Sequence, residues 1–237
     1  MTDPPPLAVD IDGTLTDAER RLDPRVFPVL REWAAEAPVV VATGKALPYP
    51  VGLCEFLAVP VNVVAENGGA VYVASADELR FTGSREKAEA VADDYAAAGH
   101  SLGWGAVDFV NRWRETELAV ALDQPEAPLR EAADRHGMRV IDTGFAYHVT
   151  SPEVNKARGL EAAADALGHS PAEFVAVGDS ENDAEMFGVV GESYAVANAD
   201  ETALAAAAHV TEAGFGDGFL EATDRIRSEF ADEGGAS

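Results

Sequence analysis

The sequence predicts an α/β protein with a doubly wound parallel sheet, into which a second, smaller α+β domain is inserted. Almost purely apolar runs at residues 7–9, 39–42 and 174–177 support the sheet, because strands covered by helices on both faces have this composition. Helical spacing of apolar residues separates the runs, as expected of alternating strands and helices. Between residues 81 and 150 this alternation changes, which indicates the inserted domain.

The composition is that of a globular protein. With 237 residues, of which 47% are hydrophobic, the chain suits one large domain or two modest ones. It contains no apolar window of about eighteen residues, and its first residues do not resemble a signal peptide, so we expect a cytoplasmic protein. Cys54 is the only cysteine, which excludes an intrachain disulfide and indicates a small buried hydrophobe.

The charge is strongly acidic, with 42 Asp and Glu residues against 17 Lys and Arg and a formal net charge of −25. This charge argues against nucleic acid and membrane surfaces as partners, because both require a clustered positive surface. At molar salt the Debye length is about 3 Å, so the repulsion within such a surface is screened. We therefore predict a halophilic source, whereas the sequence leaves a monomer and a homodimer equally open.

The first apolar run leads directly into Asp10 and Asp12. Prolines at positions 4–6 block a helix, so a buried strand delivers Asp10 to its carboxyl end, where open α/β sheets bind ligands. The two carboxylates point to opposite sides of an extended segment, and Gly13 permits the chain to turn. One carboxylate then suits a nucleophile and magnesium ligand, and the other a general acid/base. The alternative is an Asp-Gly turn in which the aspartates bond only to the backbone.

The next elements follow as βα units. A helix with its N-cap near Asp23 precedes the second strand, which ends in Thr43 and Gly44, a hydroxyl and a small backbone that can approach a phosphoryl oxygen. A plain loop is the alternative for this pair. A helix over 50–57 leads to strands over 61–65 and 70–73, and we interpret the glycine-rich turn between these strands as structural.

In the inserted region the pattern predicts the order αββαββ. The expected elements are a helix over 84–98, a strand near Val107, a strand over 118–122, a helix over 125–136 and strands over 138–141 and 145–149. Arg112 and Arg114 flank an indole on one turn and are either solvated or substrate-facing, since arginine suits bidentate recognition of carboxylate or phosphate. His148 is interpreted as a satisfied core residue.

After residue 150 the βα pattern returns. Lys156 opens a helix and is either an exposed helix-start lysine or a cation among carboxylates. The run over 174–177 ends at Asp179, and a helix beginning there places Asn182 and Asp183 one turn onward on the same side. A strand over 193–196, a helix over 200–207, a short strand over 209–211, a loop containing Gly214, Gly216 and Gly218, and a helix over 219–230 complete the prediction.

Taken in order, these strings resemble the four motifs of the haloacid dehalogenase superfamily. They are D-x-D-G-T-L from Asp10, Thr43-Gly44, Lys156, and G-D-x-x-N-D from Gly178. The resemblance is to the branch with a cap after the third strand, and it implies a core of residues 1–80 and 151–237 with a cap of residues 81–150. It also implies phosphate monoester hydrolysis through an aspartyl-phosphate.

The resemblance further implies the role of each site residue. Asp10 would be the nucleophile, and Asp12 would protonate the leaving alkoxide and then deprotonate water. Magnesium would be held by Asp10, the main-chain carbonyl of Asp12, and Asp179, with Asp183 in direct or indirect contact. The phosphoryl oxygens would be bound by Thr43, Gly44, Lys156 and Asn182.

A closer resemblance is to the archaeal phosphoglycolate phosphatase family, through E-N-G-G from Glu66 and N-R-W-R-E from Asn111. It implies a small phosphorylated metabolite whose carboxylate is read by Arg112 or Arg114, with Lys45 and His148 as further candidates. Lys45 and Ala157 depart from the expected motifs. Two alternatives stay open: a sugar-phosphate phosphatase or phosphomutase with the same core, and a non-enzymatic phospho-acceptor module.

Overall fold

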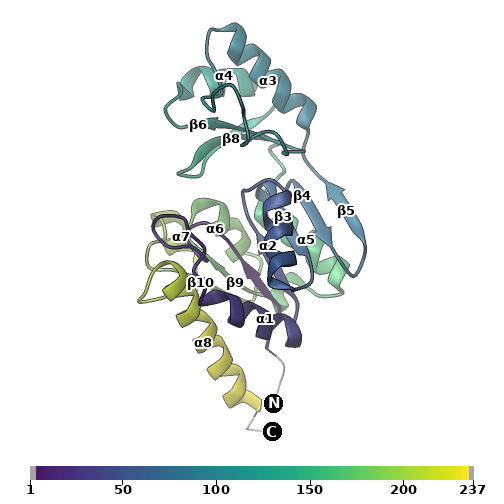
Figure 1. Ribbon diagram of the computed structural model, residues 1–237, viewed down its shortest axis with the longest axis vertical. Helices are drawn as coiled ribbons and strands as arrows, with labels where there is room; N and C mark the ends of the chain where they lie inside the picture. The colour runs from purple at the N-terminus through teal and green to yellow at the C-terminus, as the bar shows by residue number, and fades with distance from the viewer. Residues whose placement is uncertain (1–3, 235–237) are drawn as a thin grey trace.

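The computed structural model describes residues 4–234, which form a larger and a smaller part stacked along the long axis (Figure 1). The larger part, here called the core, contains an eight-stranded sheet in the order β11-β10-β9-β1-β2-β3-β4-β5. Its strands are β1 (Leu7–Val9), β2 (Val39–Ala42), β3 (Asn62–Ala65), β4 (Ala70–Val73), β5 (Glu78–Phe81), β9 (Val175–Gly178), β10 (Glu192–Ala195) and β11 (His209–Val210). All pairings are parallel except those of β4 with β3 and β5.

The first strand lies at the centre of this sheet. It pairs with β2 on one side and β9 on the other, so the strand order reverses next to it. The carboxyl ends of strands at such a reversal form the usual ligand site of an open α/β sheet. The Asp10 N–H still donates to the Val177 carbonyl at 3.0 Å, which fixes the aspartate at this edge.

Helices cover both faces of the sheet because side chains along the strands alternate between the faces. Leu7 and Val9 pack with one set of helices and Ala8 with the other. The first set is α1 (Val26–Glu36), α2 (Pro48–Leu57) and α8 (Phe215–Gly234), and the second is α5 (Lys156–Leu167), α6 (Glu181–Phe187) and α7 (Glu201–Ala206). Two single 3-10 turns, η1 (Glu66–Gly68) and η2 (Pro171–Glu173), complete the core. Cys54 is buried in the first layer, as predicted.

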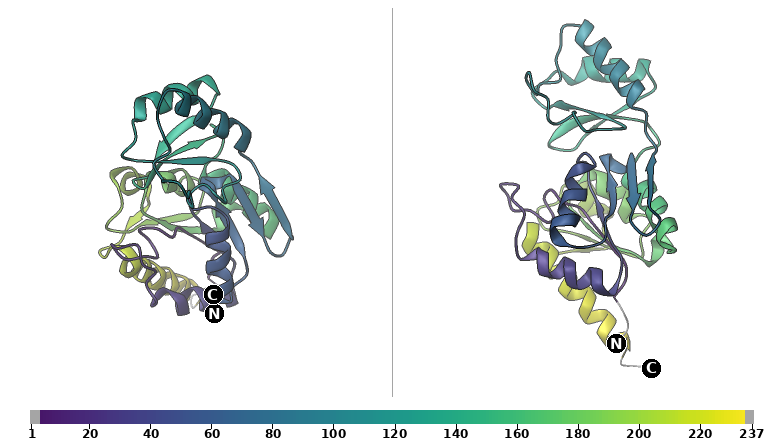
Figure 2. Two further views of the ribbon diagram at one scale, coloured as in Figure 1. Left: turned by 45° about the horizontal axis from the view of Figure 1, so that its top comes forward. Right: turned by 45° about the vertical axis from the view of Figure 1, so that its right-hand side comes forward.

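The smaller part, here called the cap, follows β5 and precedes α5. Its three-stranded sheet has the order β6-β8-β7, with β6 (Leu118–Ala121), β7 (Arg139–Asp142) and β8 (Ala146–Thr150). The helices α3 (Arg85–Ala97) and α4 (Glu126–Arg135) cover the side of this sheet that lies away from the core (Figures 1 and 2). The open face of the cap sheet therefore looks toward the carboxyl ends of the core strands.

The strand predicted near Val107 is absent, so the cap has the order αβαββ rather than αββαββ. Val107 is 64% exposed, and Asp108 accepts hydrogen bonds from the backbone and side chain of Asn111, which closes a turn. The Asn111 amide in turn bonds to both the N–H and the carbonyl of Ala119 at 2.7 and 2.9 Å. One side chain thus occupies the edge of β6 where the predicted strand would have paired.

Two core elements also differ from the prediction. The glycine-rich segment is not a separate loop, because α8 begins at Phe215 and includes Gly216 and Gly218. Gly218 is required there, since a Cβ would lie 2.5 Å from the Ala213 carbonyl oxygen. The edge strand β5 was not predicted, because its mostly exposed, polar sequence lacks an apolar run. Among the described residues, no helix combines the length and apolarity that a membrane crossing requires.

Candidate active site

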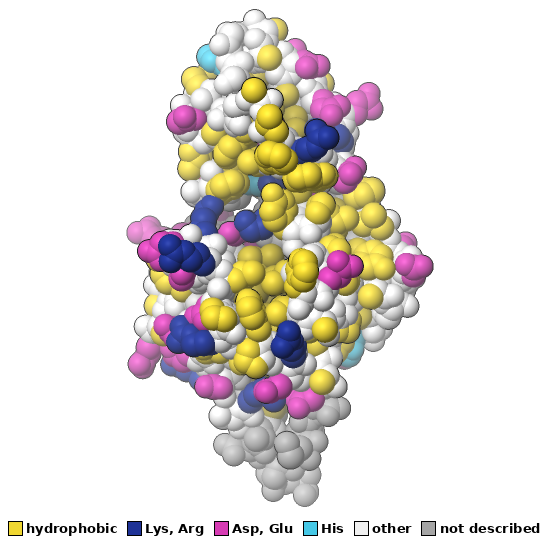
Figure 3. Space-filling view, in the orientation of Figure 1, with side chains coloured by type: hydrophobic (Ala, Val, Ile, Leu, Met, Phe, Trp, Pro, Cys, Tyr) yellow, Lys and Arg dark blue, Asp and Glu magenta, His cyan; other side chains and the backbone are white. Residues whose placement is uncertain are grey.

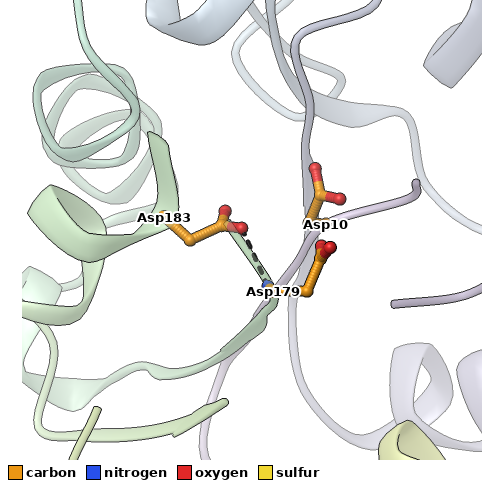
Figure 4. Close-up of side chains that lie close together, drawn as sticks. All are labelled: Asp10, Asp179 and Asp183. Atoms are coloured by element: carbon orange, nitrogen blue, oxygen red, sulfur yellow. Dashed lines mark hydrogen bonds between the residues drawn. The ribbon is translucent and has the colours of Figure 1, made fainter. Parts of the chain in front are cut away.

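Three aspartates gather where the reversal in strand order places them. Asp10 follows β1, Asp179 follows β9, and Asp183 lies in the first turn of α6, and their side chains approach one another in Figure 4. One carboxylate oxygen from each lies within 4.8 Å of the other two. Asp10 is far from the other two in the sequence, so the parallel pairing of β1 with β9 assembles the cluster.

Local backbone geometry allows this close approach. Gly13 has φ +84°, and a Cβ there would lie 2.1 Å from an oxygen of Asp179, so only glycine fits. On the other side, Asp183 Oδ2 accepts hydrogen bonds from the N–H groups of Asp179 (3.0 Å, dashed in Figure 4) and Ser180 (3.1 Å). Asp183 therefore completes the N-terminal cap of α6 and fixes the loop that carries Asp179.

Lys156 is the cation of this cluster. Its Nζ donates to Asp10 at 2.7 Å and to Asp183 at 2.6 Å, and its side chain is fully buried. Asn155 caps α5 by accepting from the Arg158 N–H, which places Lys156 in the first turn facing the sheet. Burial alone would lower the pKa of Lys156, but Asp10 and Asp183 raise it, so the ammonium is charged. The interpretation as an exposed helix-start lysine is wrong.

One ammonium does not balance three clustered carboxylates. Burial is the main reason that the pKa of Asp10 rises to about 7 and that of Asp179 to about 9, and the neighbouring carboxylates add to both shifts. Without a further positive charge, these carboxyl groups repel one another when they ionise. A hard divalent cation binds such oxygen donors and would relieve this repulsion. The cluster could therefore hold a metal ion.

The second aspartate of the first motif lies at the rim of the cluster. Asp12 forms an ion pair with Lys45 at 2.9 Å, and both side chains are about one-third exposed or less. The Thr43 hydroxyl accepts from the Lys45 N–H at 3.2 Å, so β2 ends in a tight turn beside Asp12. A Cβ on Gly44 would lie 2.9 Å from Asn67 Oδ1, which explains the glycine at this position.

A cleft of about 310 Å³ lies between the core residues and the cap. Figure 3 shows a hollow between the two parts, with Lys and Arg side chains at its edge. The cap contributes Arg114, Thr143, Phe145 and His148 to its lining, and the core contributes Asp10, Asp12, Gly13, Thr43, Gly44, Lys45, Asp179 and Asn182, among others. The predicted nucleophile, acid/base and phosphate-binding candidates therefore meet in or beside one space.

A buried polar network joins the two walls of this cleft. Asn182 of α6 donates to Asn67 of η1 at 2.9 Å, and Asn67 donates to Glu117 of the cap at 3.1 Å. Glu117 also bonds to Arg114 and to His148, and Arg114 Nη1 donates to the Gly44 carbonyl at 3.0 Å. The network places the cap relative to the core through several hydrogen bonds at once.

Glu66 forms a second connection between core and cap. Its carboxylate accepts from the N–H groups of Glu115 and Thr116 and from the Thr116 hydroxyl at 2.7 Å. Glu66 has φ +52° and Asn67 has φ +56°, both uncommon for residues with a Cβ. Burial and the nearby Glu117 raise the pKa of Glu66. The turn that was interpreted as structural therefore also attaches the cap to the core.

Two of the predicted substrate-binding residues lie in different places in the structure. Arg114 is 6% exposed and lines the cleft, whereas Arg112 is exposed and lines a separate surface hollow with Arg85 and Asp108. The structure thus does not bring Arg112 to the site. His148 is buried and hydrogen-bonded, as predicted for a histidine in an apolar strand. It also lines the cleft.

Sequence reasoning missed Asn67 and Glu117 as site residues. The E-N-G-G turn was visible, but its residue types suit any hairpin, and only the tertiary structure shows what they contact. One signal could have identified Glu117. It is an acidic residue directly before the apolar run of β6, a position at which a charged side chain can be buried. Arg20 was also missed: it lines the cleft mouth and lies 4.8 Å from the centre of the Phe145 ring.

The fold and the cluster at its strand ends define a class of hydrolases. A profile of the haloacid dehalogenase-like hydrolases matches residues 123–222, and full-length relatives extend the match to nearly the whole chain. The chain belongs to the haloacid dehalogenase-like hydrolase family.

Among curated relatives, two proteins named phosphoglycolate phosphatase are each 62% identical. The protein from Natronomonas pharaonis matches over 94% of this chain and 97% of its own length. That from Haloarcula marismortui matches over 95% and 99%. These haloarchaeal relatives fit the halophilic character predicted from the acidic surface.

Solved structures confirm the fold with its cap. A protein from Thermoplasma acidophilum superimposes with a TM-score of 0.83 at 23% identity, covering 95% of this chain and 99% of that one. A haloacid dehalogenase-like hydrolase from Bacteroides thetaiotaomicron gives a TM-score of 0.76 at 19% identity, covering 94% and 99%.

Proposed function

We propose that this chain is a magnesium-dependent phosphatase that hydrolyses 2-phosphoglycolate to glycolate and phosphate. The observation that carries the proposal is the position of Asp10, buried at the end of β1 with Lys156 at 2.7 Å and facing the same cleft as Asp12. The name of the 62% identical relatives supports the choice of substrate.

The reaction proceeds in two displacements. Oδ1 of Asp10 accepts from Lys156, so the other oxygen attacks phosphorus while the bond to the alkoxide breaks. Asp12 gives its proton to the leaving alkoxide, which departs as glycolate. Asp12 then takes a proton from water, whose oxygen attacks the aspartyl-phosphate and releases phosphate with the Asp10 carboxylate restored.

The remaining residues bind and orient the phosphoryl group. Lys156, Thr43, the Gly44 backbone and Asn182 are proposed to hold its oxygens. Asp10, Asp179 and the Asp12 main chain are proposed to hold Mg²⁺, which when bound supplies charge stabilisation for the transferring phosphoryl group. Both oxygens of Asp183 already accept hydrogen bonds, which favours indirect contact with the ion.

The test is release of inorganic phosphate from a panel of monoesters, with Mg²⁺ and molar KCl. We expect 2-phosphoglycolate to give a higher kcat/KM than hexose phosphates, and EDTA to abolish turnover. A preference for a hexose phosphate would instead support the sugar-phosphate phosphatase. Absence of turnover on every ester, with magnesium present, would support the phospho-acceptor module.

The expected setting is the cytoplasm, with a small phosphorylated metabolite as the partner and a monomer or homodimer as the assembly. The acidic surface supports a salt-rich cytoplasm, because its self-repulsion falls when salt screens it. Greater stability at low salt than in molar KCl would contradict the halophilic assignment.

A further inference from the structure

Glu117 is a cap carboxylate that takes no part in the chemistry proposed above. It is fully buried directly before β6, and it accepts hydrogen bonds from Arg114 Nη1, from His148 Nδ1 at 2.7 Å and from Asn67 Nδ2 at 3.1 Å. Burial alone would raise the pKa of Glu117, but His148 and Arg114 hold it below its usual range. An ionised carboxylate therefore lies behind the cap wall of the cleft.

This carboxylate determines the orientation of His148. Because an ionised carboxylate only accepts hydrogen bonds, His148 Nδ1 carries a proton and donates it to Glu117. The other ring nitrogen, Nε2, lies on the opposite side of the imidazole and has no hydrogen-bond partner among residues 4–234. The ring lines the cleft that contains Asp10 and Asp12. Nε2 is thus the nitrogen available to a molecule in the cleft.

The charges around the cleft make this nitrogen a binding group for an anion. The Arg114 and Glu117 charges cancel, so this pair leaves no net negative charge beside His148 that would repel an anion. The lysines of the core wall already have partners, with Lys45 paired to Asp12 and Lys156 paired to Asp10 and Asp183. Arg20 also lines the cleft, but it is exposed to water and packs over the Phe145 ring. His148 is 2% exposed, so an anion bound to it is shielded from water, which strengthens a charged hydrogen bond.

We propose that His148 is a specificity-determining residue, and that its Nε2–H binds the carboxylate of a short phosphorylated hydroxy acid. Glu117 is the positioning residue that orients the ring, and Arg114 shares this support. The inference rests on the proposed function, because it requires a substrate with a carboxylate close to its phosphate. With the phosphate held by the core, a two-carbon acid extends its carboxylate toward the cap wall.

The test compares 2-phosphoglycolate with 2-phosphoglycolamide, which has the same shape but no negative charge at that end. Wild-type enzyme should have a KM for the acid about tenfold or more below that for the amide. In His148→Asn, the KM for the acid should rise by about ten- to a hundredfold, because a charged hydrogen bond is lost. The kcat values should stay unchanged, and the KM for the amide should change much less than that for the acid.

A matched control is His136→Asn. His136 is also a cap histidine with a carboxylate partner, Asp94 at 3.0 Å, but it does not line the cleft. The His136→Asn substitution should leave the KM values of both esters unchanged. If His148→Asn does not fold, the comparison of acid and amide in the wild-type enzyme still tests the inference.

Three results separate the two proposals. Equal KM values for acid and amide in the wild-type enzyme would overturn the inference without any variant. Equal effects of the His148 substitution on both esters would also overturn it, and would leave 2-phosphoglycolate hydrolysis intact as a function. Hydrolysis of p-nitrophenyl phosphate without hydrolysis of 2-phosphoglycolate would overturn the proposed function and the inference together.

Discussion

The core wall and the cap wall of the cleft are built in different ways. On the core wall, Asp10 and Asp179 follow parallel strands, and Lys156 begins a helix that packs on the same sheet. On the cap wall, Arg114 and His148 are held by Glu117, which is itself bonded to Asn67 of the core. The sheet therefore fixes the groups proposed for phosphoryl transfer, whereas side-chain hydrogen bonds fix the groups proposed to select the substrate.

The largest expected effect is on the core wall, from Asp10→Asn. A carboxamide has nearly the same shape but is a poor nucleophile, so phosphate release from every monoester should fall to the limit of detection. The thermal midpoint should stay close to that of the wild type. Asp165→Asn, the same change at an exposed position of α5, is the control and should retain full activity. Activity above a trace in Asp10→Asn would remove Asp10 as the nucleophile.

A smaller loss is expected for Asp12→Asn, which removes the proposed general acid/base. The rate with 2-phosphoglycolate should fall by about 10²- to 10⁴-fold. With p-nitrophenyl phosphate the rate of the first displacement should fall less, because nitrophenolate leaves without a proton. Rapid-mixing measurements of nitrophenolate release check this difference, and a wild-type rate of glycolate release would refute the role of Asp12.

The acidic cluster also predicts a pH dependence of stability opposite in sign to that of Glu117 on the cap wall, whose pKa is lowered. The pKa values of Asp10 and Asp179 are raised from 3.8 to about 7 and about 9, so their protonated forms are favoured in the folded state. Without metal, this contribution to the free energy of unfolding is present below about pH 4 and is lost as pH rises through both values. Mg²⁺ should restore most of the loss, and more strongly at pH 9 than at pH 6.

Thermal denaturation with EDTA and with Mg²⁺, at constant ionic strength, measures this effect. A loss of about 1 kcal/mol corresponds to roughly 2–4 °C in a chain of this size. Asp179→Asn is the comparison variant, because it removes one of the titrating carboxyls and should flatten the pH dependence. A magnesium effect that is the same at both pH values would contradict the repulsion within the cluster.

The smallest expected effect concerns the attachment of the cap. Thr116→Val removes the hydroxyl that donates to Glu66 at 2.7 Å, at a fully buried position. The free energy of unfolding should fall by about 1–3 kcal/mol, and KM should rise equally for 2-phosphoglycolate and 2-phosphoglycolamide, because cap position matters to both. Thr202→Val at an exposed position of α7 is the control. A selective effect on one ester would show that this attachment also reads the substrate.

The same contrast explains what the sequence could predict. Asp10 and Asp179 were predictable, because apolar runs ending in acidic residues identify strand ends, and parallel strands bring those ends together. Asp183 follows Asp179 by one helical turn. The roles of Asn67 and Glu117 depend on how the cap lies on the core, which no local pattern encodes. The false strand near Val107 has the same origin, since only the folded structure shows the Asn111 side chain bound at the edge of β6.

The central claim is that Asp10 of the core wall forms a covalent phosphoryl intermediate. The most direct measurement mixes Asp12→Asn with p-nitrophenyl phosphate and Mg²⁺, quenches in acid, and maps the modified peptide by mass spectrometry. We expect a burst of nitrophenolate and one phosphoryl group on Asp10, because this variant lacks the proposed base that activates water. Nitrophenolate release without a burst and without protein modification, or a phosphoryl group on another residue, would contradict it.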